Sequence, residues 1–223
     1  MLKNQNFFDG RIQWIEETDF RSNVLDAIDD RLFTCFFTDD DIVYRPISSD
    51  LLFQLDDETV LCFSLRLGKN LRVSYSRNRP MALRGDISLG EQFLKWKWTE
   101  SPFDFGYPLS LDGHIFRTEE IRYLTESISF QNPNTYEASL QTLTFPPRDY
   151  MTSYQHSVLV NSPNNIVQNV FPNRRAEVHA YSTRYLNSAY LAGNIIDIES
   201  IDFTNIIGCH QELFLPLIKT TTV

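Results

Sequence analysis

The sequence lacks several features that would assign a protein to a large class. No apolar run is long enough to cross a bilayer, so no α-helical membrane span is expected. Basic residues are few: 29 acidic against 20 basic residues give a formal net charge of −9, which argues against nucleic acid or an anionic membrane as the main partner. The phosphate-binding motif Gly-x-x-x-x-Gly-Lys-Ser/Thr is also missing, which excludes a P-loop nucleotide site.

Cysteine is scarce as well. Cys35, Cys62 and Cys209 are far apart, and none is part of a Cys-x-x-Cys pair. We therefore expect reduced thiols that pack as small core residues, rather than disulfides or zinc ligands. The polar start at residues 1–6 does not resemble a secretory signal, so a cytoplasmic location is expected.

What the chain does contain is enough apolar material for a core. Its 223 residues are 42% hydrophobic and 13% aromatic, which is typical of one globular domain covering residues 1–223. No internal repeat, low-complexity tract or linker interrupts it.

Three consecutive carboxylates follow an apolar segment. Residues 33–37 form a continuous run typical of a strand buried on both faces of a sheet, and Asp39, Asp40 and Asp41 come directly after it. Adjacent acids repel one another unless a cation or a substrate hydroxyl is bound between them. In open α/β sheets the ligand crevice lies at the carboxyl ends of the strands, which predicts a binding site here. The alternative is a solvated acidic turn.

The periodicity of the chain predicts an α/β fold. An alternating strand at 11–16, an amphipathic helix at 19–28 and the buried strand at 33–37 form a β-α-β unit, which favours a three-layer domain with a mostly parallel central sheet. The carboxylates would then end an inner strand. Further elements are expected as a helix at 50–55, strands at 59–66, 94–98 and 157–160, a turn that leads into a strand over 107–116, and helices at 118–127 and 183–192. Residues 132–135 are expected to cap another helix, which carries Glu137 in its first turn.

Four sequence blocks carry a resemblance to a known family. They are Phe-Thr-Asp-Asp-Asp at 37–41, Ser-Leu-Arg-Leu-Gly at 64–68, Tyr-Pro-Leu-Ser-Leu-Asp-Gly-His at 107–114 and Pro-Asn-Thr-Tyr-Glu at 133–137. In this order they resemble a group of bacterial glycosyltransferase-like proteins with the GT-A fold, the nucleotide-diphospho-sugar transferase fold. The resemblance implies a nucleotide-sugar donor, a glycan or other hydroxyl acceptor, a Mn²⁺ or Mg²⁺ ion on the Asp-x-Asp acids, and a carboxylate base.

One departure from the family concerns the N-terminal part. GT-A enzymes begin with a strand-helix-strand unit that holds the nucleotide base, whereas this sequence starts near the family's third strand, at Trp14. The expected domain is thus N-terminally shortened. This leaves open a catalytically silent GT-A remnant that serves as a binding or assembly module, with a second copy or a partner subunit at the exposed sheet edge.

The resemblance assigns roles to the acids and to Arg66. Asp39 and Asp41 are the expected metal ligands, while Asp40 or Asp39 would contact ribose or sugar hydroxyls. Arg66 is the last residue of the strand at 59–66, where it would either face the diphosphate of the donor or pair with the three consecutive acids. His114 closes the third block and is expected on the donor side; any of the four histidines could also supply a further metal ligand.

Two further carboxylates are expected at the reacting centre. Asp112 resembles the acid that positions the sugar, although it could simply cap its turn. Glu137 resembles the general base, although a glutamate in the first turn of a helix is also stabilised by the helix dipole. A glycoside hydrolase could use the same pair across a sugar, but it would leave the three consecutive acids unexplained.

Overall fold

The computed structural model describes residues 12–143, 148–164, 174 and 181–220. Its α-helices are α1 (Phe20–Ala27), α2 (Thr118–Glu126), α3 (Pro133–Leu140) and α4 (Thr183–Leu191). Short 3₁₀ helices are η1 (Ser49–Asp56), η2 (Trp98–Glu100), η3 (Phe103–Gly106) and η4 (Ile198–Ser200). The strands are β1 (Phe33–Cys35), β2 (Asp41–Val43), β3 (Val60–Ser64), β4 (Val73–Ser74), β5 (Arg79–Pro80), β6 (Ile87–Leu89), β7 (Phe93–Lys97), β8 (His114–Arg117), β9 (Tyr150–Tyr154), β10 (Leu159–Asn161), β11 (Asn194–Ile196) and β12 (Leu217–Lys219).

The main sheet is mixed. Six strands lie in the order β1-β8-β3-β9-β7-β6, and only the β3–β9 pair is parallel. The mixed α/β class is therefore confirmed, but the prediction of a mostly parallel sheet was wrong. One reason is visible at β6 and β7, whose connection is too short for the crossover that a parallel pair requires.

The predicted β-α-β unit does not form. Residues 12–17 have no regular structure, and Trp14 is 72% exposed. The alternating pattern there suits a strand, but no neighbouring strand pairs with it in the described chain. As a result β1 is an end strand of the sheet, paired antiparallel with β8, and not the inner strand that we expected.

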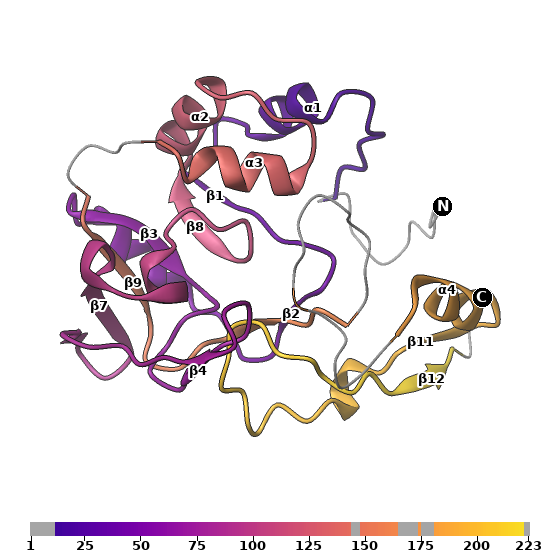
Figure 1. Ribbon diagram of the computed structural model, residues 1–223. Coiled ribbons are helices and arrows are strands. Elements are labelled where there is room, and N and C mark those ends of the chain that lie inside the picture. The colour runs from indigo at the N-terminus through magenta and orange to yellow at the C-terminus, as the bar shows by residue number, and fades with distance from the viewer. Residues whose placement is uncertain (1–11, 144–147, 165–173, 175–180, 221–223) are drawn as a thin grey trace.

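Both faces of the sheet are covered, which explains the continuous apolar sequence of β3. Cys62 of β3 points into a core that includes Ile121 of α2 and Tyr136 of α3, whereas its neighbour Phe63 packs with Leu51 of η1 on the opposite face. Successive side chains of a strand alternate between faces, so a strand covered on both sides must be apolar throughout. Figure 1 shows α1, α2 and α3 together at one end of the molecule.

The helix ends follow local signals in the sequence. Asp19 accepts a hydrogen bond from the Ser22 amide at the start of α1, and Asn132 forms a capping box with Thr135 at the start of α3. Helix α4 ends just before Gly193, whose φ of +80° suits glycine.

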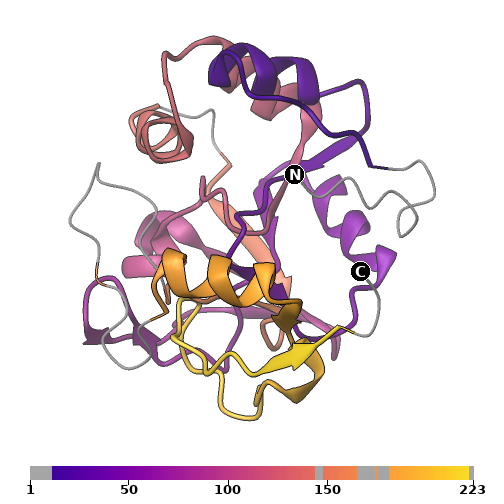
Figure 2. The same cartoon turned by 90° about the vertical axis from the view of Figure 1, so that its right-hand side faces the viewer.

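The C-terminal part forms a smaller unit. Helix α4 lies beside the β11–β12 pair, away from the α1–α3 end in both views (Figures 1 and 2). All three cysteines are free thiols: Cys62 and Cys209 are buried and Cys35 is partly buried, as predicted. In the described ranges, no helix is long and apolar enough to span a membrane.

Candidate functional site

The three consecutive acids form a turn rather than the end of an inner strand. Asp39 and Asp40 lie in the turn between β1 and β2, and Asp41 is the first residue of β2. The turn is closed by two bonds: the Asp41 amide donates to the Thr38 carbonyl (3.2 Å) and the Thr38 amide to Asp41 Oδ2 (3.0 Å). We call residues 38–41 the acid turn.

Asn161, from β10, gathers the oxygen atoms of the acid turn around one amide group. Its Nδ2 donates to Asp40 Oδ1 (2.8 Å), Asp41 Oδ1 (3.2 Å) and Thr38 Oγ1 (3.1 Å). This is possible because β10 pairs antiparallel with β2 and places Asn161 opposite Asp41. The sequence did not indicate that Asn161 would donate to the acid turn. Its one local signal is that a polar residue follows a short apolar segment.

The acid turn is short of positive charge. Burial, and then the charge of Asp112, raises the pKa of Asp41 to about 7, and burial likewise raises the pKa of Asp40. Asp39, in contrast, is exposed. Two carboxylate oxygens that converge beside a hydroxyl are a set that fits a hard divalent cation, so the residues present are compatible with Mn²⁺ or Mg²⁺.

Arg66 organises the second half of the site. Its side chain is 1% exposed, NH1 donates to Asp112 Oδ2 (3.0 Å), and Nε lies 3.4 Å from His114 Nε2. NH1 is also 3.4 Å from His210 Nε2. The ion pair that Arg66 forms is with Asp112, and not with the three consecutive acids that we considered as its partners. We call Arg66, Asp112, His114 and His210 the Arg66 cluster.

Asp112 connects the two halves of the site. Thr38 Oγ1 donates to Asp112 Oδ1 (3.2 Å) while accepting from Asn161, and His210 Nε2 lies 3.2 Å from Asp112 Oδ2. Burial alone would raise the pKa of Asp112, but the hydrogen bond with His210 and the charge of Arg66 hold it below its ordinary value. Asp112 is therefore an ionised, fixed carboxylate.

The turn that carries Asp112 depends on Gly113. The Gly113 amide donates to the Phe36 carbonyl (2.8 Å), and the Gly113 carbonyl accepts from the Leu65 amide (2.9 Å). Its φ is +67°, and a Cβ atom here would lie 2.9 Å from Leu159 Cδ1. The turn thus joins the segments that leave β1 and β3, and Asp112 lies between them.

Glu137 lies on the far side of Ser110 from Asp112. Its Oε1 accepts from Ser110 Oγ (2.9 Å) and from the Leu111 amide (3.1 Å), while Ser110 Oγ is also 3.4 Å from Asp112 Oδ2. Burial, and then the charge of Asp112, raises the pKa of Glu137. Glu137 is not in the first turn of α3, contrary to our expectation, because the helix begins at Pro133.

The histidines differ in their surroundings. His114 is fully buried behind Arg66, and burial together with the Arg66 charge lowers its pKa to about 3, so it is neutral. His156 is exposed, and His179 lies outside the described residues. Of the two further candidates that the structure describes, His210 contacts the site and His156 does not, and the sequence did not single out His210.

Comparisons with family models, curated proteins and solved structures find no match to this chain. Its function has therefore to be inferred from the geometry and the chemistry of the site.

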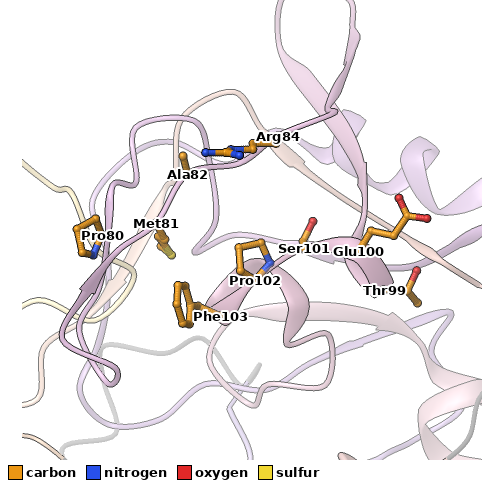
Figure 3. Close-up of a pocket in the computed structure, with 9 residues that line it drawn as sticks. All are labelled: Pro80, Met81, Ala82, Arg84, Thr99, Glu100, Ser101, Pro102 and Phe103. Carbon is orange, nitrogen blue, oxygen red and sulfur yellow. The ribbon is translucent and has the colours of Figure 1, made fainter.

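A hollow of about 680 Å³ lies elsewhere on the molecule and includes none of these site residues. Figure 3 shows its lining, which is Pro80, Met81, Ala82, Arg84, Thr99, Glu100, Ser101, Pro102 and Phe103. It has one basic and one acidic side chain and no cluster of titratable groups, so the carboxylates at the acid turn and Arg66 remain the better candidate for chemistry.

Proposed function

We propose that this chain is a metal-dependent glycosyltransferase of the GT-A type, moving a sugar from a nucleoside-diphosphate donor to an acceptor hydroxyl. One observation carries the proposal: residues from all four resembling blocks form one connected hydrogen-bonded network. Thr38 bonds to Asp112, Asp112 to Arg66, and Ser110 links Asp112 to Glu137. Blocks that served only for packing would have no reason to bring four acidic or basic segments together.

In this proposal the acid turn binds the metal and the donor. Mn²⁺ or Mg²⁺ would neutralise the charge that develops on the leaving diphosphate. Asp39 and Asp41 stay the predicted ligands, and the convergence of Asp40 and Asp41 oxygens on Asn161 adds Asp40 to them. Asp39, which is exposed, would also be free to meet a sugar or ribose hydroxyl.

The buried carboxylates have separate roles. A general base needs a pKa near the working pH, and the raised pKa of Glu137 suits that role. Asp112 is held ionised by Arg66 and His210, which suits a positioning role toward the sugar and not proton donation. Arg66 acts through Asp112, and His114 supports Arg66 from behind.

The hydrogen bonds of Asp112 weaken the case for a glycoside hydrolase. That mechanism requires one of two carboxylic acids to be protonated as the general acid. If Glu137 were that acid, Asp112 would have to approach the sugar from the other side, yet both of its oxygens are already engaged by Thr38, Arg66 and His210.

A silent binding module is the second candidate, and it is favoured by the position of β1. This strand ends the sheet, and no strand in the described chain pairs with its other edge. Unpaired strand edges offer backbone groups to a second copy or a partner subunit. In that case the acid turn would be left over from an active enzyme and would no longer take part in catalysis.

The deciding experiment measures sugar transfer from a panel of nucleotide sugars with Mn²⁺, for wild type and Glu137→Gln. A working transferase should lose about 10²–10⁴ of its rate in this variant while retaining donor binding by calorimetry. The matched control is Glu91→Gln, an exposed residue, which should keep the full rate. Wild type that neither binds nor hydrolyses any donor would support the silent module instead.

A further inference from the structure

A second group of potential metal ligands lies beside the Arg66 cluster. Asp104 in η3, Cys209 and His210 place their ligand atoms within 4.8 Å of one another, the one such group of three in the described part of the chain. Cys209 is fully buried and Asp104 is 6% exposed. Asp104 Oδ2 is buried without a hydrogen-bond partner among the described residues, which is costly for a carboxylate unless something else binds it.

We propose that Asp104, Cys209 and His210 bind a zinc-type transition-metal ion. A thiolate, an imidazole and a carboxylate are the donor types that Zn²⁺ accepts, whereas Mn²⁺ and Mg²⁺ prefer the all-oxygen set of the acid turn. Cys209 Sγ and His210 Nδ1 are 3.5 Å apart. With usual zinc bond lengths of about 2.3 and 2.05 Å at a tetrahedral angle, the expected sulfur–nitrogen separation is about 3.6 Å.

The other ring nitrogen of His210 supplies an independent observation. His210 Nε2 lies 3.2 Å from Asp112 Oδ2, so Asp112 can accept its proton and leave Nδ1 free to bind a metal. Metal-binding histidines commonly donate their second ring N–H to a carboxylate in this way, which fixes the ring and raises its basicity. An isolated parallel β-bridge between Asn161 and His210 also fixes the backbone at His210.

The charge balance agrees with a bound cation. Arg66 is the one buried guanidinium of the network, and its NH1 already pairs with Asp112. The single charge of Arg66 acts on Cys209, Asp112, Asp104 and Glu137 together. A divalent ion would therefore add the missing positive charge and engage the Asp104 oxygen that has no hydrogen-bond partner in the described chain. This inference does not rest on the proposed transferase activity.

The test is a titration of the metal-stripped full chain with Co²⁺, which reports tetrahedral thiolate coordination by its visible bands and its sulfur-to-cobalt charge-transfer band. We expect saturable bands in wild type that Zn²⁺ removes by displacement. Cys209→Ser should lose the charge-transfer band. The matched control, Cys35→Ser, should keep it, because Cys35 belongs to β1 and not to this group. The double variant Asp39→Asn/Asp41→Asn should keep the band too, which separates this site from the acid turn.

Two nearly isosteric variants keep the test decisive if Cys209→Ser does not fold. Asp104→Asn should weaken Co²⁺ binding by at least about tenfold, and Asp112→Asn, which acts through His210, by roughly 10–100-fold. The proposal is overturned if wild type shows no saturable thiolate–cobalt band, or if Asp104→Asn binds Co²⁺ as tightly as wild type.

Discussion

The acid turn and the Arg66 cluster meet at the Thr38 hydroxyl, but they are built in different ways. Arg66 and His114 are almost completely buried, and the charge of Arg66 is matched by Asp112. In the acid turn Asp39 is exposed, and the other two carboxylates share a neutral donor, the Asn161 amide. One half of the site is therefore fixed by matched buried charges, whereas the other keeps unmatched charge near solvent, where a ligand can exchange.

The largest expected effect comes from breaking the buried half. Arg66→Met keeps much of the length of the side chain but removes the guanidinium from Asp112, which keeps His210 as its remaining ion-pair partner, so the free energy of unfolding should fall by roughly 3–5 kcal/mol. Denaturant unfolding measures this. Arg122→Met is the control, because the Arg122–Glu126 pair is exposed and its loss should cost at most about 1 kcal/mol. Equal losses in both variants would show that the buried Arg66–Asp112 pair contributes no more to stability than an exposed pair.

A smaller effect is expected from Asn161→Ala in the exposed half. Removing the amide leaves Asp40 and Asp41 without their shared donor, which should lower the free energy of unfolding by about 1–3 kcal/mol. Mn²⁺ should restore part of this loss, since it can replace the amide between the same oxygens. Asn205→Ala, at an exposed turn position, should change little and respond to Mn²⁺ as wild type does. A lack of any metal response would argue against a cation at these oxygens.

The pH dependence of stability probes Glu137. Because its pKa is raised in the folded protein, the folded state binds more protons than the unfolded state from about pH 4.5 upward. Stability should therefore fall as the pH rises from 4.5 through the folded pKa, and Glu137→Gln should remove this part of the slope. Unfolding free energies at a series of pH values give the result, with Glu91→Gln as the control. An unchanged slope in Glu137→Gln would mean that Glu137 titrates normally.

The smallest change in stability is expected for Asp39→Asn. Its side chain is exposed, so the free energy of unfolding should stay within about 0.5 kcal/mol of wild type. Mn²⁺ affinity measured by calorimetry should nevertheless fall, because one ligand charge near solvent is lost. Asp30→Asn, another exposed acid, should leave both quantities unchanged. If Asp39→Asn retains full affinity, the metal is bound by Asp40 and Asp41 alone.

Local sequence signals predicted much of the fold. The amphipathic pattern at 19–28 and the cap at Asn132 mark helices that are present, and the apolar run of β3 is a buried strand. The strand β9 was missed although it lies in the middle of the sheet, because Thr152 and Ser153 are polar yet buried. Strand direction was also missed, since pairing between distant segments leaves no periodic trace.

In the candidate site, too, contacts between distant segments could not be predicted from the sequence. Asp112 and Glu137 could be proposed because each lies in a recognisable block, and the structure places both beside Ser110. Asn161, Asp104 and Cys209 could not, because their neighbours come from remote parts of the chain. Cys209 was predicted to be a packing residue, and its burial is correct, but neither burial nor the adjacent His210 reveals that Asp104 lies beside them.

The Gly113 turn has a consequence for the order of folding. Its amide and its carbonyl bind the segments that leave β1 and β3, so Asp112 reaches its place only after both strands have docked on β8. Such contacts between distant parts of the chain form slowly, because the loops must close first. The proposed binding of a metal ion should thus be among the last properties to return during refolding, after the helical signal of α1 to α4.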